Sequence, residues 1–281
     1  MIEIIFLGVL ALLWVGFAVV QDLKSREIAN WLSFSLIIFA LGFRFFYSLF
    51  SGEGFSFFYQ GLIGLGIFFV IGNLFYYGRM FAGGDAKLMI ALGAVLPIYA
   101  TLTENLQVFF MFFLVFFFSG AVYSFGVSGA IAIKNSKKFK KEFVSQFRKS
   151  RKLIYFVMVL GLGIMLAGFV ETIFLFLGVL FFLLPYLYVF AKAIDESCMV
   201  KEVSVGKLTE GDWLYEDISL GKKKLKAKWD GLSKEDIKLI KKKYKKVKIK
   251  QGIPFSPVFL ISLIILGLLI LLGVELWNPF F

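Results

Sequence analysis

The 281-residue sequence contains no histidine and only one cysteine, Cys198. Without histidine the chain cannot form a Ser-His-Asp triad or a histidine-ligated zinc site, and a single thiol cannot form an internal disulfide or a cysteine zinc cluster. We therefore expect no metal and no cofactor. Any chemistry must come from carboxylates, lysine, tyrosine or hydroxyl groups.

Charged residues are also scarce, at 18% of the chain, whereas 59% of the residues are hydrophobic. They form runs of about 20 apolar residues, long enough to cross a hydrocarbon layer roughly 30 Å thick. The pattern predicts an all-α polytopic membrane protein with about eight transmembrane helices. The predicted spans are residues 3–20, 32–50, 57–77, 85–102, 107–133, 153–170, 172–191 and 255–274.

Basic residues are nearly absent from one side of this topology. If the loops alternate between two sides, one side with both termini carries only glutamate as a charged residue. The other side carries every lysine and arginine except Arg44, which is expected to snorkel outward from the outer end of the second span. By the positive-inside rule, we expect a multi-pass protein of the cell membrane with both termini outside and the basic loops in the cytoplasm.

The first long cytoplasmic segment, residues 134–152, is strongly basic. Phe139, Phe143 and Phe147 recur in it at helical spacing, which is typical of an amphipathic helix on a membrane surface. The membrane context accounts for the positive charge, so we expect binding to the anionic inner leaflet and no binding to nucleic acid.

The second long cytoplasmic segment, residues 192–251, begins acidic and ends rich in lysine. Ser233 and Asp236 form a capping signal for a helix in its second half. We expect a small cytoplasmic α+β appendage here, and the alternative is a solvated charged segment that only aids topology. The chain is thus divided into a membrane core, a basic loop, a helix pair, the appendage and a last helix with the C-terminus. Their predicted bounds are 1–133, 134–152, 153–191, 192–251 and 252–281.

Two aspartates lie at the predicted cytoplasmic edge: Asp22 follows the first span and Asp85 begins the fourth. Ionisable residues at such depths are costly and tend to be functional. Two carboxyl groups held close together share a proton. One can then deprotonate a water molecule while the other protonates or hydrogen-bonds a carbonyl oxygen, which is peptide hydrolysis without a metal or a covalent intermediate.

The residues around the two aspartates suit this use. Gly83 and Gly84 precede Asp85 and would allow a positive φ and the close approach of a substrate backbone. Asn30 is expected to cap the second span. The structural alternative is that Asp85 is an ordinary first-turn helix residue and Asp22 a juxtamembrane carboxylate paired with a nearby base.

Three stretches, "DLKSREIANWL", "AGGDAKLMIALGA" and "GIPFSPVFL", resemble motifs of the type IV prepilin peptidases and archaeal preflagellin peptidases. The second is similar to the GxGD segment of that family, the first to its other aspartate segment, and the third to the Pro-Phe-x-Pro segment that opens its last span. Ala82 and Ala29 stand where the family has glycine and proline. The matching residues are Asp22, Ile28, Asn30, Leu32, Asp85, Lys87, Leu88, Leu92, Gly93, Ala94, Pro254, Phe255 and Pro257.

The resemblance implies an intramembrane aspartyl endopeptidase that cuts short basic leaders from pilin-like or archaellin precursors at the cytoplasmic face. It implies that Asp22 and Asp85 are the catalytic residues. Bacterial members often carry a tetracysteine zinc region and methylate the new amino terminus, and a chain with one cysteine fits an archaeal-type enzyme better. The residues expected to support the site are Gly83, Gly84, Lys87 and Asn30.

The leader expected from the resemblance is basic, so an acidic surface could attract it. The first half of the appendage offers such a surface. Its candidate substrate-binding residues are Glu210, Asp212, Glu216 and Asp217.

Helix dipoles favour a division of roles between the aspartates. Asp22 ends a predicted helix and Asp85 begins one, so the dipoles predict that Asp85 is the ionised, water-activating base. A non-enzymatic alternative remains, in which the chain is a transporter or an assembly scaffold and the two aspartates form a proton or cation site.

Overall fold

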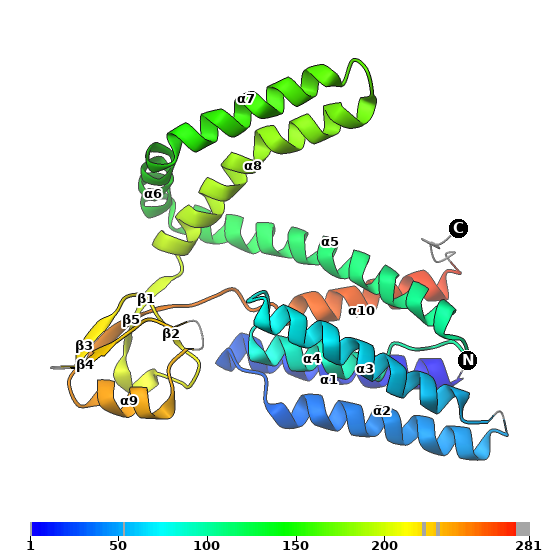
Figure 1. Cartoon of the computed structure of the whole chain (residues 1–281). Helices are drawn as coiled ribbons and strands as arrows, with labels where there is room; N and C mark the ends of the chain where they lie inside the picture. The colour runs from blue at the N-terminus through cyan, green and yellow to red at the C-terminus, as the bar shows by residue number, and fades with distance from the viewer. Residues whose placement is uncertain (1, 53, 221–222, 229–230, 274–281) are drawn as a thin grey trace. The chain divides into compact units, whose positions relative to one another are not determined.

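The chain folds mainly into helices, with a small region that contains β-strands (Figure 1). The computed structural model describes residues 2–52, 54–220, 223–228 and 231–273. Two compact units are present. One comprises the residues up to Ser124 together with those from Pro254 onward, and the other comprises Phe125–Ile253. The last helix therefore belongs with the first helices of the chain.

The first unit is a helical bundle with one apolar core. Within it α10 packs against α1, and α4 packs against both α2 and α3. Large apolar side chains also cover the outer faces of these helices, as expected where lipid is the solvent. Its elements are α1 (Ile2–Ser25), α2 (Asn30–Phe50), α3 (Ser56–Tyr77), α4 (Gly83–Gly93), the first part of α5 (Leu102–Lys134) and α10 (Ser256–Leu271).

Five of the described helices, α1, α2, α3, α5 and α8 (Thr172–Ser197), are long and apolar enough to cross a membrane. A sixth span is possible if α6 (Ser136–Lys149) and α7 (Arg151–Ala167) are counted together. The prediction of eight spans is therefore not confirmed. The predicted last span corresponds to α10, and its final residue, 274, lies outside the described residues.

The predicted fourth span, residues 85–102, is much shorter in the structure. Helix α4 ends at Gly93. Its 11 residues rise only about 16 Å at 1.5 Å per residue, which is half of the hydrocarbon thickness. Gly64 of α3 lies against this end of α4, where an added Cβ would collide with the carbonyl oxygen of Gly93. The short helix thus packs backbone to backbone against its neighbour.

Arg44 of α2 binds the backbone where the chain turns after α4. The prediction that this side chain snorkels outward is wrong, because it is fully buried. It acts as an internal cap, since a cation is favourable at the C-terminal end of a helix and the carbonyls there need donors. Its guanidinium donates hydrogen bonds to the carbonyl oxygens of Ala94 (2.8 Å), Phe57 (2.9 Å), Val95 (3.0 Å) and Pro97.

The second unit contains a pair of packed helices, α7 and α8, and the appendage. The appendage is an α+β structure, as predicted from the sequence. Its three-stranded antiparallel sheet has the order β1-β5-β2, β3 pairs with β4, and α9 begins with the expected capping box of Ser233 and Asp236. The bounds are β1 (Val200–Ser204), η1 (Val205–Lys207), β2 (Trp213–Leu214), β3 (Ile218–Leu220), β4 (Lys223–Leu225), α9 (Lys234–Lys241) and β5 (Lys246–Lys250).

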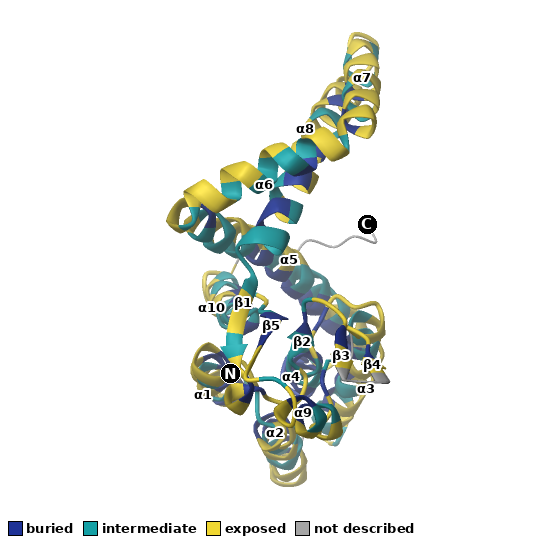
Figure 2. Cartoon of the chain, turned by 90° about the vertical axis from the view of Figure 1, so that its left-hand side faces the viewer, coloured by how far each residue is buried: buried dark blue, intermediate teal, exposed yellow. Residues whose placement is uncertain are grey.

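The predicted basic helix is α6, which meets α7 at an angle of 77°. Its aromatic side chains pack on α8: the ring of Phe139 lies 5.5 Å from that of Phe190, and the ring of Phe147 lies 6.3 Å from that of Tyr186. Helix α8 therefore covers part of the apolar face that was expected to contact lipid. In Figure 2 the outer faces of α7 and α8 are largely exposed, as suits a membrane-embedded pair.

Candidate active site

Asp22 is a buried carboxylate near the end of α1, with 8% of its surface exposed. The start of α10 binds it: Ser256 Oγ donates a hydrogen bond to Asp22 Oδ2 at 2.7 Å, and the Ser256 N–H lies 3.4 Å from the same oxygen. Pro257 follows in the first turn of α10, where proline is favourable because its fixed φ suits a helix start. The third sequence motif therefore holds Asp22 in place.

Asp85 lies in the first turn of α4 and is partly buried. The turn is closed by a hydrogen bond from the Ala86 N–H to the carbonyl oxygen of Ala82 at 3.1 Å. The carboxyl group of Asp85 is close enough to Asp22 for their charges to interact. Two acid groups far apart in the sequence thus come close together in the first unit.

Two further contacts join the segments that carry the aspartates. Gly84 lies against Ile28, and a Cβ added at Gly84 would come within 3.2 Å of the Ile28 side chain. Lys87 Nζ donates a hydrogen bond to Asn30 Oδ1 at 2.7 Å. The prediction that Asn30 caps α2 is wrong, because Asn30 is the first helical residue and the cap position, Ala29, makes no side-chain hydrogen bond.

The positive φ expected for the glycine pair is not observed, whereas the predicted close approach of a substrate backbone stays a prediction. Gly83 and Gly84 are absent from the described residues with positive φ, so they are not needed for a left-handed turn. Gly84 instead allows the close approach of Ile28, whose side chain would have to shift by a few tenths of an ångström to accept an added Cβ. Ala82, which departs from the family pattern, has an extended backbone with φ −69° and ψ 161° that any residue can adopt. The alanine therefore imposes no strain on the entry to α4.

The predicted division of roles between the aspartates rested on the end of α1 and the start of α4. The structure adds a third helix end, the start of α10. Asp22 lies at the C-terminal end of α1 but also at the N-terminal start of α10, which donates hydrogen bonds to it. The two dipoles at Asp22 oppose each other. A closely interacting pair titrates jointly, so we treat Asp22 and Asp85 as one acid–base unit.

Sequence reasoning missed Ser256. The Pro-Phe-x-Pro segment was singled out for its prolines and its phenylalanine, while the serine between them forms the contact with Asp22. The available signal was a hydroxyl residue directly before the proline that starts the last apolar helix, at the same predicted membrane edge as the two aspartates. In the part of the chain that the structure describes, no three cysteine, aspartate or glutamate side chains cluster closely enough to hold a metal ion.

The acidic candidates of the appendage all have partners inside the second unit. Asp212 accepts a hydrogen bond from the Thr209 N–H at 2.8 Å. The backbone N–H of Ala227 and the ammonium group of Lys224 hold the pKa of Asp217 below its ordinary value. The remaining contacts are solvent-exposed ion pairs, which reduce the negative charge that a basic peptide would meet. They join Glu210 to Lys234 (3.5 Å), Glu216 to Lys248 (3.4 Å) and Asp217 to Lys224 (3.3 Å).

Comparison with known families gives a match over part of the chain. The model of the type IV leader peptidase family matches residues 9–125. This range includes both aspartates and the contacts of Asn30 and Gly84, and it ends before the appendage and Ser256. No curated protein and no solved structure matches the chain.

Proposed function

We propose that the chain is a membrane aspartyl endopeptidase of the type IV leader peptidase family, whose model matches residues 9–125. Its substrates are pilin-like or archaellin precursors, from which it removes a short basic leader. The observation that carries the proposal is that the two aspartate segments lie together inside the matched range, where Gly84 packs on Ile28 and Lys87 Nζ donates to Asn30 Oδ1 at 2.7 Å. Paired carboxyl groups are a sufficient apparatus for hydrolysis in a chain without histidine.

The proposed reaction uses the two aspartates together. One carboxylate removes a proton from a water molecule as its oxygen attacks the carbonyl carbon of the scissile peptide bond. The other carboxyl group donates a hydrogen bond or a proton to the carbonyl oxygen, where negative charge develops. The proton taken from water then passes to the leaving amine as the C–N bond breaks. Ser256 keeps Asp22 in position during these steps through its hydrogen bond.

We place the site at the cytoplasmic face of the cell membrane. The basic residues Lys24, Arg26, Arg79 and Lys87 lie close in sequence to the two aspartates, and basic residues favour the cytoplasmic side. Both termini are then outside. The basic leader directly precedes the apolar helix in the precursor's sequence, so a leader in the cytoplasm and a helix in the bilayer would bring the scissile bond to this edge.

The single cysteine supports an archaeal-type enzyme without a zinc region and without methyl transfer. A tetracysteine site needs four thiolates, and this chain offers one thiol, Cys198. The expected product is therefore a precursor with a free, unmethylated amino terminus. Mass spectrometry of the product, with S-adenosylmethionine present, tests this part of the proposal.

Anionic lipids are proposed as a second partner, through α6. If α7 crosses the bilayer, the 77° angle places α6 roughly along the membrane surface. Its exposed basic side chains then meet the headgroups of the inner leaflet. They are Lys137, Lys138, Lys140, Lys141, Arg148 and Lys149.

The test of the peptidase is release of a leader from a purified precursor in detergent micelles. We expect the unmodified protein to release the leader, and Asp22→Asn and Asp85→Asn each to lower kcat by about 1,000-fold or more, since each removes half of the acid–base pair. Glu171→Gln is the control, because Glu171 is an exposed acid whose side chain makes no capping hydrogen bond. A transporter or scaffold would release no leader.

Unchanged cleavage by the doubly substituted protein would show that a contaminating protease, not this chain, cuts the precursor. Cleavage that survives Asp22→Asn but not Asp85→Asn would overturn the paired mechanism. Circular dichroism of each variant confirms that lost activity does not reflect lost folding.

A further inference from the structure

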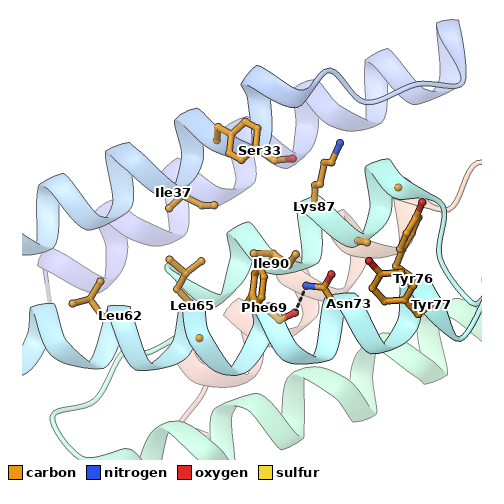
Figure 3. Close-up of a pocket in the computed structure, with 14 residues that line it drawn as sticks. Ser33, Ile37, Leu62, Leu65, Phe69, Asn73, Tyr76, Tyr77, Lys87 and Ile90 are labelled. Carbon is orange, nitrogen blue, oxygen red and sulfur yellow. Dashed lines mark hydrogen bonds between the residues drawn. The ribbon is translucent and has the colours of Figure 1, made fainter. Parts of the chain in front are cut away.

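A groove lies between α2, α3 and α4 in the first unit (Figure 3). Its volume is about 720 Å³. The three helices contribute residues at helical spacing, so each presents one face to the groove. Along most of its length the lining is apolar, and examples are Ile37 of α2, Leu62 and Phe69 of α3, and Ile90 of α4.

One end of the groove is polar and lies beside the proposed active site. Figure 3 shows Leu62 toward one end and Asn73 and Tyr76 toward the other. Gly83, two residues before Asp85, and the half-buried cation Lys87 also line the groove. The apolar part of the groove therefore leads along the bundle to the start of α4, where Asp85 stands.

Ser33 is a second observation that points to a ligand. It lines the groove, only 2% of its surface is exposed, and its hydroxyl group has no hydrogen-bond partner. A buried polar group without a partner costs about 1–3 kcal/mol. A bound molecule that supplies a partner for the hydroxyl would remove this cost.

An intramembrane peptidase has a specific need for such an arrangement. A peptide bond within or next to a helix must leave its hydrogen-bonded turn before water can attack it. The freed N–H and C=O groups then need new partners, because hydrocarbon offers none. A hydroxyl, an amide and an ammonium group at one end of an apolar groove meet this need, while the apolar part holds the turns that remain helical.

We infer that this groove binds the apolar helix of the precursor, with its polar end receiving the unwound segment next to the scissile bond. The inference rests on the proposed function and names the part of the substrate that the site recognises. The occupant is an apolar helix rather than a soluble peptide, because the groove is open along the side of the bundle and its lining is mainly apolar.

Gly66 offers a way to fill the groove without disturbing the fold. It lines the groove, is exposed, and has no atom within 4 Å of an added Cβ. Gly8 of α1 is a matched control, since it is also a helical, exposed glycine with open space but lies outside the groove. Two substrates are compared: a full precursor, and a soluble peptide that spans the cleavage site and stops before the apolar helix.

For the full precursor, Gly66→Leu should raise KM by about tenfold, since a bulky side chain would overlap the bound helix. Its kcat/KM for the short peptide should stay unchanged, and Gly8→Leu should change neither substrate. An unchanged KM for the full precursor with Gly66→Leu would overturn the inference. An equal loss for both substrates would also overturn it, because the effect would then not depend on the apolar helix.

Cross-linking gives a readout that does not depend on cleavage. In a Cys198→Ser background, which removes the native thiol, Gly66→Cys should form a disulfide with a cysteine placed in the apolar helix of the precursor. Gly8→Cys should form none. If the disulfide forms but the unmodified protein cleaves no precursor, the result supports binding of the apolar helix in the groove and refutes the proposed peptidase activity. A different result would overturn the inference: no disulfide forms, and a thiol-reactive phospholipid labels Gly66→Cys whether or not the precursor is present. The groove would then bind lipid.

Discussion

Ser256 Oγ lies 2.7 Å from Asp22 Oδ2, so the start of α10 fixes the carboxyl group at the end of α1. Ser256 has no exposed surface. A hydrogen bond to a charged group is worth about 1.5–3 kcal/mol. The last helix of the first unit thus takes part in the proposed site through a single buried contact.

Ser256→Ala is expected to lower kcat about tenfold with little change in KM, because Asp22 loses the group that positions it. Ser256→Thr keeps the hydroxyl group and should retain most of the activity. Ser262→Ala is the control, since Ser262 is equally buried in α10 but donates to the Val258 carbonyl oxygen. The pH profile of kcat should move for Ser256→Ala only. Equal losses for the alanine and threonine variants would contradict the positioning role.

Lys87 and Asn30 are expected to act as a pair. Their hydrogen bond joins α4 to the start of α2, so losing either partner should loosen the same contact. Lys87→Met and Asn30→Ala should each lower kcat/KM, and the double variant should be little worse than either, with a coupling of about 1 kcal/mol. Lys24→Met, an exposed cation at the same edge, is the control. Additive losses in the double variant would show that the two side chains act independently.

Arg44 is expected to be essential for stability. Arg44→Met leaves the buried carbonyl groups after α4 without donors and should destabilise the protein by about 3–5 kcal/mol. Arg44→Lys keeps the positive charge but loses the planar guanidinium that reaches several carbonyl oxygens, so its loss of stability should be intermediate. Unfolding of the purified proteins in detergent measures the stability of both variants. Arg151→Met, an exposed position at the start of α7, should have little effect, and equal stability of Arg44→Met would refute the capping role.

Binding of the basic leader by the acidic residues of the appendage stays a prediction. Neutralising Glu210, Asp212, Glu216 and Asp217 together leaves their lysine partners uncompensated, so the surface becomes more positive. KM for a basic leader should then rise about threefold at low salt and approach the unmodified value at high salt. Neutralising Glu104 and Glu171, outside the appendage, is the control. A KM that stays constant at low salt would remove these residues from the substrate site.

Much of the architecture could be predicted from patterns of neighbouring residues in the sequence. Apolar runs located the helices, and the Ser233 and Asp236 signal located the start of α9. These features depend on neighbouring residues alone. The length of α4 was overestimated because its apolar sequence continues past Gly93. The carbonyl groups that follow its actual end are bound by Arg44, which is distant along the chain. Asn30 was assigned to a cap for the same reason: its real partner, Lys87, follows two helices later.

The amino-acid sequence by itself determined that the protein is built of apolar helices, that histidine and disulfide chemistry are absent, and that two aspartates are available near helix ends. These conclusions follow from composition and spacing, which need no knowledge of packing. Only the tertiary structure decided that Ser256 binds Asp22, that Arg44 is an internal cap and that a groove leads to the start of α4. Such contacts join distant segments, and their energies exist only once the helices have packed.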